Sequence, residues 1–152
     1  MKIGSLSVDP PLLLAPMAGI SNLPFRLLNR EYGCALAFTE MISAAGLVRD
    51  TRKTRRYLDT APGDRPLGVQ LFGSEPAVLA EAAAIATAAG ADLIDLNMGC
   101  PVRKVVRTGA GAALMRQPAL AFDIMAAVRR ATSLPLTVKI RAGWNARNVN
   151  AP

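Results

Sequence analysis

Cys100 is the residue whose setting most strongly indicates chemistry, and it lies within LIDLNMGCPVRKVVRTGAGAALMR at 93–116. This segment begins with the short apolar run of a strand that is buried on both faces. The run breaks at MGCP, residues 98–101, because Gly and Pro prevent both a continuing strand and an immediate helix. Parallel α/β folds place their chemistry at the carboxyl ends of strands. The segment leaves two interpretations open: a reactive thiol, or a buried structural cysteine before a solvated basic loop.

The residue types that are missing narrow the chemistry. The chain contains no histidine, which removes the commonest metal ligand and general base. Its two cysteines, Cys34 and Cys100, are too far apart in the sequence for a CxxC metal site. A cytosolic setting argues for two free thiols rather than a disulfide. These observations argue against a metal site, a zinc enzyme and a Ser-His-Asp hydrolase within this chain.

The composition indicates one domain with a basic surface. The chain has 152 residues, of which 51% are hydrophobic, and a formal net charge of +7. This excess of positive charge suits a polyanion such as RNA, although a generally basic proteome would produce the same balance. No uncharged apolar run reaches about 18 residues, and the start, MKIGSLSVDPP, lacks the apolar stretch of a signal peptide. We therefore expect a cytoplasmic protein with no membrane contact.

Strand and helix signals alternate along the chain. Short apolar runs predict parallel strands at 12–15, 35–41, 66–72, 93–98 and 136–140. Helices are predicted from Ser21 or Asn22 to Tyr32, in parts of 43–58, at 76–89 with Ser74 as the cap, and at 117–131. Residues 1–10 are expected to form a short hairpin. This repetition predicts a parallel sheet with helices packed on it.

Two closures of such a sheet are conceivable, an open doubly wound sheet and a (β/α)8 TIM-type barrel. An open sheet usually carries GxGxxG or GxxxxGK[ST] after its first strand, and neither pattern occurs. Polar residues instead stand near successive strand ends: Glu40, Gln70, Asn97, Cys100, Lys139 and Arg141. A barrel mouth requires this distribution, because each strand contributes a group to one central site. Since a full barrel takes about 250 residues, we predict a partial barrel that contains about the first five βα units.

Taken together, these segments resemble the tRNA-dihydrouridine synthases, most closely the bacterial B-type subgroup. The matching stretches are LAPMAGISNLPFR at 14–26, TEM at 39–41, VQLFGSEP at 69–76, GADLIDLNMGCPVRKVVRTGAGAALM at 90–115 and PLTVKIRAGW at 135–144. They follow in the right order and cover nearly the whole chain. NMGCPVRKV with a later TVKIRAGW is highly specific, whereas APMAG also occurs in other FMN barrels.

The resemblance implies an oxidoreductase that depends on FMN and uses NADPH as reductant. Its substrate would be tRNA, in which it reduces the C5–C6 double bond of particular uridines to dihydrouridine. By resemblance Cys100 is the proton donor: a hydride passes from flavin N5 to C6 while the thiol protonates C5. An ordinary thiol suits this role, because its pKa of about 8.5 keeps it mostly protonated at neutral pH.

The remaining site residues also follow from the resemblance. The backbone of Pro16, Met17 and Ala18 would lie against the flavin, and Gln70 and Lys139 would hydrogen-bond its ring. A cation beside the N1–C2=O edge would stabilise the anionic reduced flavin, which gives a purpose to a lysine on an apolar strand.

Other polar residues would contact the substrate. Asn97 is expected to orient the uracil edge or the flavin, and Arg141 to contact the uridine or its phosphate. Arg103, Lys104 and Arg107 would border the mouth and hold phosphates around a uridine that has to be flipped out of the folded tRNA. Glu40 is expected either to contribute to the mouth or to be the structural partner of a nearby cation, and Cys34 is expected to be a small core residue.

The family's FMN-phosphate site, later barrel strands and C-terminal helical tRNA-binding domain are all expected to lie outside residues 1–152. We therefore expect the isolated chain to be inactive and to self-associate through the exposed edges of its half-barrel. Two alternatives stay open. One is another FMN-dependent barrel that acts on a free pyrimidine or an enone, and the other is a non-catalytic half-barrel that only assembles or binds RNA.

Overall fold

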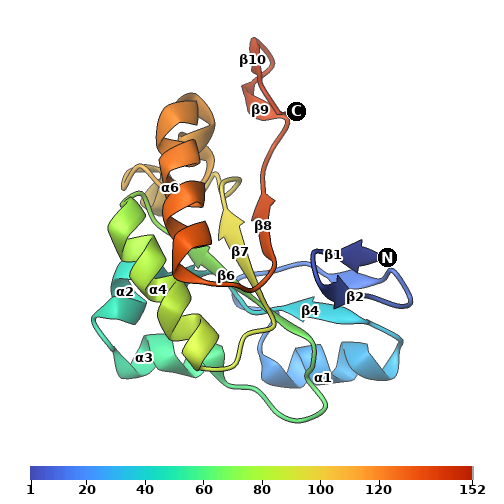
Figure 1. The fold of residues 1–152 in the computed structure, drawn as a ribbon. Coiled ribbons are helices and arrows are strands. Elements are labelled where there is room, and N and C mark those ends of the chain that lie inside the picture. The colour runs from blue at the N-terminus through green and yellow to red at the C-terminus, as the bar shows by residue number, and fades with distance from the viewer. Residues whose placement is uncertain (152) are drawn as a thin grey trace.

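The computed structural model describes residues 1–151 and shows a parallel sheet that curls into half a barrel (Figure 1). Its strands run in the order β3 (Leu13–Leu14), β4 (Leu36–Phe38), β6 (Leu67–Phe72), β7 (Leu93–Asn97) and β8 (Leu136–Lys139), with β5 (Ile42–Ser43) also paired to β6. All of these pairs are parallel. Strands that follow one another in the chain are neighbours in the sheet, as in a barrel and unlike a doubly wound sheet. The prediction of a partial TIM-type barrel is confirmed.

Helices cover the convex face of the sheet. Figure 1 shows α2 (Ala44–Val48), α4 (Pro76–Ala88) and α6 (Pro118–Ala131) side by side on that face, while α1 (Leu23–Glu31) lies below β4. Shorter helical turns are α3 (Arg52–Arg55), η1 (Arg56–Leu58), α5 (Arg103–Val106) and η2 (Gly111–Arg116). The expected N-terminal hairpin is present as β1 (Lys2–Ile3) and β2 (Leu6–Ser7). A second hairpin, β9 (Gly143–Asn145) and β10 (Asn148–Val149), extends beyond β8 and was not predicted.

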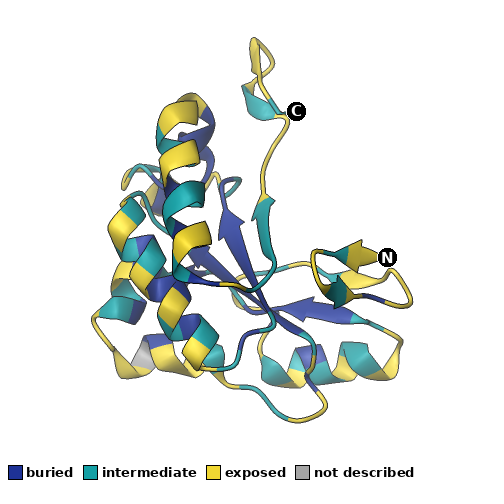
Figure 2. Ribbon diagram, in the orientation of Figure 1, coloured by how far each residue is buried: buried dark blue, intermediate teal, exposed yellow. Residues whose placement is uncertain are grey.

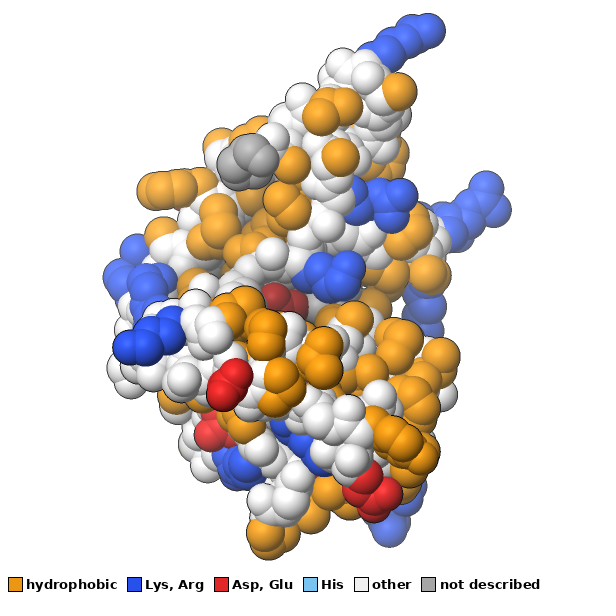
Figure 3. Space-filling model, turned by 90° about the vertical axis from the view of Figure 1, so that its right-hand side faces the viewer, with side chains coloured by type: hydrophobic (Ala, Val, Ile, Leu, Met, Phe, Trp, Pro, Cys, Tyr) orange, Lys and Arg blue, Asp and Glu red, His pale blue; other side chains and the backbone are white. Residues whose placement is uncertain are grey.

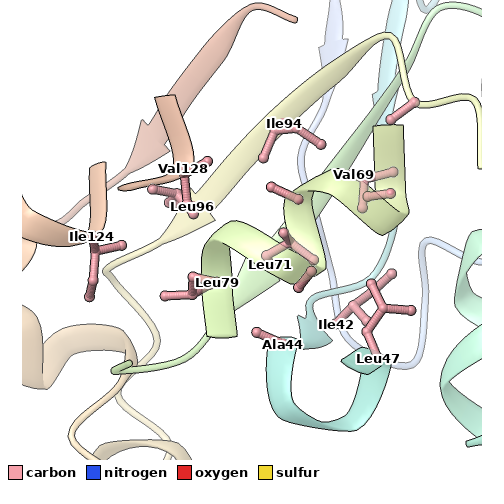
Figure 4. Packing of buried hydrophobic residues seen from close by; sticks show 14 of the residues in the cluster. Ile42, Ala44, Leu47, Val69, Leu71, Leu79, Ile94, Leu96, Ile124 and Val128 are labelled. Carbon is pink, nitrogen blue, oxygen red and sulfur yellow. The ribbon is translucent and has the colours of Figure 1, made fainter. Parts of the chain in front are cut away.

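The main core lies between the sheet and these helices. Because side chains alternate along a strand, every second residue of β6 and β7 faces the helices, among them Val69, Leu71, Ile94 and Leu96. They pack against Leu79, Ile124 and Val128, all at most 1% exposed (Figure 4). Figure 2 shows the result, with buried central strands and helices whose outer faces are exposed. The alternate residues of each strand therefore face the concave side.

A smaller apolar cluster fills the floor of the half-barrel. Leu36, Phe38 and Leu93 form this cluster on the concave side, where Val8 beside the N-terminal hairpin packs with them. Gly68 lies opposite Phe38 in the register of β4 and β6. A Cβ atom at Gly68 would come within 2.5 Å of the Phe38 ring. Glycine is therefore needed at position 68 to leave room for the aromatic ring.

The second predicted strand, 35–41, is interrupted, so its prediction as one continuous strand is wrong. Phe38 pairs with Gly68, while Ile42 pairs with Leu71, so the second strand contains one more residue than β6 over this stretch. Such an extra residue is a β-bulge. The hydroxyl of Thr39 accepts a hydrogen bond from the backbone N–H of Gln70 at 3.2 Å within this irregularity. The bulge separates β4 from β5 and directs residues 39–41 toward the mouth.

The helix caps agree with the sequence in one case and differ in another. Asn22 caps α1, and its side chain accepts from the N–H of Phe25 at 3.1 Å. Ser74 does not cap α4: the cap position is Glu75, without a side-chain hydrogen bond, and the Ser74 hydroxyl donates to the Thr108 carbonyl at 2.7 Å. Ser74 thus connects the β6–α4 loop to the segment after α5. Over residues 1–151, none of the helices has the length and apolar character needed to cross a membrane.

A buried ion pair joins α1 to the loop before β6. Arg26 is 2% exposed, and its guanidinium donates to Asp64 Oδ2 at 2.7 and 2.9 Å and to the carbonyls of Ser21 and Asp59. A buried charge is tolerated when it is paired and its hydrogen bonds are made. Residues 38 positions apart are connected in this way.

We expect Gly68→Ala to destabilise the fold, because its methyl group would overlap the buried Phe38 ring. The expected loss is about 1–3 kcal/mol of unfolding free energy, the usual cost of overpacking. Gly63→Ala is the matched control, since its Cβ would meet only Leu27 Cδ2 at an ordinary 3.6 Å. Urea unfolding of both variants measures the difference, and equal midpoints would contradict the proposed packing constraint.

Candidate functional site

The concave face of the sheet carries a row of polar side chains above its apolar floor. Gln70, Asp95 and Thr137 are in register on three neighbouring strands. Gln70 Nε2 donates to Asp95 Oδ2 at 2.5 Å, and Thr137 Oγ1 donates to Asp95 Oδ1 at 2.6 Å. Gln70 is 1% exposed and Asp95 is 4% exposed. Figure 3 shows the open side of the half-barrel, where an acidic side chain is recessed among hydrophobic groups and basic groups lie above it.

The next layer toward the carboxyl ends contains Asn97 and Lys139, which are again in register. Asn97 Nδ2 donates to Gln70 Oε1 at 2.9 Å and lies 3.8 Å from the sulfur of Met41. Lys139 is exposed on the concave side and makes no ion pair within residues 1–151. The two polar residues that the sequence places on β6 and β7 are thus in direct contact, with the lysine on the adjacent strand.

Asn97 also determines where Cys100 lies. Its Oδ1 accepts the backbone N–H of Cys100 at 2.9 Å and that of Gly99 at 3.2 Å. This side-chain-to-backbone arrangement forms a turn directly at the end of β7. Cys100 is half-buried at this turn, and its thiol is free. The sequence prediction that this cysteine lies at the carboxyl end of a parallel strand is confirmed.

The glycine-rich segment after α5 contacts the cysteine loop at the carbonyl group of Cys100. Gly111 has a φ of +61°, and a Cβ there would lie 2.7 Å from the carbonyl oxygen of Cys100. The backbone N–H of Ala112 donates to that same oxygen at 2.9 Å. Two independent contacts, one through Asn97 and one through η2, therefore hold the backbone on either side of the thiol.

Burial raises the pKa of Asp95 above its ordinary value, while hydrogen bonds from Thr137 and Gln70 and the charge of Lys139 act in the opposite direction. Desolvation disfavours a carboxylate, whereas donors and a nearby cation favour it. Sequence reasoning missed both Asp95 and Thr137. The available signal was the alternation of strand side chains, since each precedes a predicted site residue by two positions.

Arg141 lies two residues beyond Lys139, the last residue of β8, and therefore belongs to the segment that follows the strand. Its guanidinium is 3.5 Å from the carbonyl oxygen of Gly99, across the cysteine loop. A hollow of about 510 Å³ opens here, lined by Lys139, Arg141, Trp144 and neighbouring residues. The Arg116 guanidinium stacks 5.2 Å from the centre of the Trp144 ring on the other side. Arg141 thus borders the mouth near the thiol.

The loop after β3 lies at the opposite side of the mouth. Pro16 and Met17 are half-buried and Ala18 is exposed. The hydroxyl of Ser21 bonds both the N–H and the carbonyl of Met17, at 3.0 and 3.1 Å. Glu40 accepts the backbone N–H of Gly19, so its partner is a peptide group and not the cation that was expected.

The basic residues that follow the thiol are all free to contact a partner. Arg103, Lys104 and Arg107 are exposed on and just after α5, and none makes an ion pair within the described chain. Cys34, in contrast, is half-buried after α1, and its thiol donates to the Leu36 carbonyl. Residues 1–151 contain no group of three His, Cys, Asp or Glu side chains that could hold a metal ion.

Gly111→Ala should disturb the cysteine loop beyond the general cost of a left-handed alanine. Gly109→Ala is the matched control, because Gly109 also has positive φ (+77°) but its Cβ would meet only Ser74, at 3.4 Å. The left-handed conformation alone costs about 1–2 kcal/mol. Overlap with the Cys100 carbonyl and with Val105 Cγ1 should add about 1–3 kcal/mol at Gly111. Urea unfolding tests this, and equal losses in the two variants would show that the contact with Cys100 is unimportant.

Known proteins are similar in sequence to nearly the whole of this chain. A family model described as Dihydrouridine synthase (Dus) matches residues 13–151. The chain is 45% identical over 152 residues to a tRNA-dihydrouridine synthase B of Xanthomonas campestris pv. campestris, and 43% identical over 150 residues to the protein of that name in Pseudomonas aeruginosa. A probable tRNA-dihydrouridine synthase of Rhodobacter capsulatus is 42% identical over 153 residues.

These matches cover nearly all of this chain but only part of each relative. They include 100%, 99% and 99% of the chain and 46%, 45% and 47% of the respective relatives. The family match includes β3 through β10 and every site residue described above. With a half-barrel whose strand ends carry the matched motifs, the chain belongs to the dihydrouridine synthase family.

Proposed function

We propose that this chain provides the proton donor and part of the flavin-ring site of an enzyme that reduces uridines in tRNA to dihydrouridine, with FMN as cofactor and NADPH as reductant. The observation that carries the proposal is the position of Cys100, which Asn97 holds at the carboxyl end of β7 beside the concave polar layer. Relatives that match this chain over 152 and 150 residues are named tRNA-dihydrouridine synthase B.

The donor set on the concave face fits a flat ring with a polar edge. Lys139 offers an exposed, unpaired ammonium group in register with Asn97, and Gln70 lies one layer deeper. Within residues 1–151, the N–H of Ala18 makes no hydrogen bond, so it is available to a ligand on the other side of the mouth. Pro16, Met17, Ala18, Gln70 and Lys139 would hold the ring, and Lys139 would stabilise negative charge on it. When bound, FMN supplies the hydride for the C5–C6 double bond.

The thiol of Cys100 would act as the general acid. It donates its S–H proton to C5 of the uracil, which leaves a thiolate that water reprotonates. The turn that holds its backbone orients the side chain, and this orientation is what general acid catalysis requires. Asn97 is engaged on Gln70 and the loop backbone, so its role is to place the thiol and the ring-binding amide. Arg141 lies close enough to the loop to contact the uracil or its phosphate.

The exposed cations of α5 support tRNA rather than a free pyrimidine as the substrate. Arg103, Lys104 and Arg107 follow the thiol directly and have no acidic partner among the described residues. A flipped-out uridine brings flanking phosphates to the rim of the pocket, where such side chains bind them. A small free base has no comparable anionic groups.

Cys100→Ala in the complete gene product that carries this chain should lower dihydrouridine formation by about 10²–10⁴-fold, the usual contribution of a general acid. Flavin content should stay unchanged, because the thiol is not among the ring-binding groups. Mass spectrometry of the tRNA and the flavin absorbance measure the two effects. Cys34→Ala is the control and should retain activity. Full turnover by Cys100→Ala would remove this residue from the mechanism.

Replacing Arg103, Lys104 and Arg107 together by Gln should weaken tRNA binding and make it less dependent on salt. If all three contact phosphates, the slope of log K against log salt concentration should flatten by roughly 2–3. Arg129 and Arg130, at the end of α6, provide the control pair for a general loss of positive charge. Filter binding at several salt concentrations tests this, and an equal slope change in the control pair would argue against a specific rim.

A further inference from the structure

A single chain of hydrogen bonds runs across three strands to the thiol loop. Thr137 donates to Asp95, which also accepts from Gln70; Gln70 in turn accepts from Asn97. Asn97 accepts from the N–H groups of Gly99 and Cys100 at the far end. The side chains of Gln70, Asp95 and Asn97 are at most 9% exposed. Little water can reach these bonds, so each polar atom depends on its neighbour.

The two ends of this chain determine the direction of every bond between them. A carboxylate oxygen only accepts, and a backbone N–H only donates. Each side-chain amide has one donating and one accepting end. If Asp95 accepts from Gln70, the Gln70 oxygen must face Asn97, and the Asn97 oxygen must then face the Cys100 loop. Turning either amide around would oppose two acceptors or two donors inside a buried site, which is costly.

From this geometry we infer that Asp95 is a positioning residue, whose carboxylate directs the Gln70 and Asn97 amides so that the Asn97 oxygen closes the loop carrying Cys100. The carboxylate does not contact the thiol itself. The inference rests on the proposed function only for the use of the loop in catalysis, because the loop geometry can be measured without any turnover. It also assigns a purpose to a buried acid whose burial raises its pKa and disfavours its charge.

The Asp95→Asn variant provides the direct test. Its side-chain amide could present either the oxygen or the NH₂ group to Gln70, so the reversed chain would become accessible. In that reversed state the Asn97 NH₂ group faces the loop N–H groups and the loop opens. We expect Asp95→Asn to increase the rate at which iodoacetamide alkylates Cys100 by about fivefold, the factor that one net hydrogen bond contributes.

Cys34 is the internal reference in the same molecules, because it lies after α1 and outside this chain of bonds. Asp92→Asn is the matched control variant: Asp92 is also an acid by β7, but it accepts from Leu67 N–H and pairs with Arg65 near the amino end of the strand. Both cysteines should react at unchanged rates in Asp92→Asn. Amide hydrogen exchange at 98–102, which does not depend on thiol ionisation, should rise only in Asp95→Asn.

A double variant provides the rescue. In Gln70→Glu with Asp95→Asn, the carboxylate moves one position along the chain. There it can accept from the introduced amide on one side and from Asn97 on the other, which preserves the direction at the loop. Cys100 alkylation and exchange should return to the level of the unaltered protein. This variant also decides the question if Asp95→Asn alone does not fold.

All measurements use the complete gene product that carries the chain. The inference is overturned if Asp95→Asn leaves Cys100 unchanged, if Cys34 accelerates equally, or if the double variant remains open. Loss of activity in Cys100→Ala is assayed separately on tRNA, so a failure of the proposed function is distinguishable. A protein that reduces no uridine but shows the predicted alkylation pattern would retain Asp95 as the positioning residue of this loop.

Discussion

Buried polar groups on neighbouring parallel strands have to satisfy one another, and this requirement organises the concave face of the half-barrel. In a buried site an unpaired amide or carboxylate costs free energy. Gln70, Asp95 and Thr137 avoid that cost because the parallel register brings them side by side. Their bonds leave Asn97 with one end committed to Gln70 and the other to the Cys100 backbone. The register of the sheet therefore determines the position of the Cys100 backbone through the side chains of Gln70, Asp95 and Asn97.

Along each strand, residues that pack against the helices alternate with residues that face the concave side. Residues such as Val69, Leu71 and Ile94 pack against helices and belong to the larger of the two buried apolar clusters. Their neighbours in sequence face the concave side, apolar near the floor and polar near the mouth. Substitutions among the polar residues can thus alter chemistry while the helix-facing core stays intact. The bulge at residues 39–41 extends this separation, since it brings Met41 next to Asn97.

Sequence patterns predicted the order of the elements and the polar residues at strand ends. They predicted less well those features that depend on contacts between neighbouring strands or distant segments. Gln70, Asn97 and Lys139 stand out because a polar residue near the end of an apolar run is conspicuous. Asp95 and Thr137 were missed, since their role depends on the register between strands, which no single strand pattern contains. The buried ion pair of α1 and the β-bulge were out of reach for the same reason, because each depends on segments that are distant in the sequence.

The two layers of the half-barrel differ in how much they depend on a neighbour at its open edges. The central members of the helix-facing core are at most 2% exposed with residues 1–151 alone. At the edges, Leu12 before β3, Leu13 in β3 and Ile140 after β8 are 54%, 41% and 39% exposed. Lys139 stands on that second edge, so its ammonium faces solvent. The backbone conformation of the Cys100 loop is therefore fixed by buried residues of this half-barrel. The interaction of the Lys139 ammonium with a ligand depends instead on what covers the edge, because solvent screens an exposed charge.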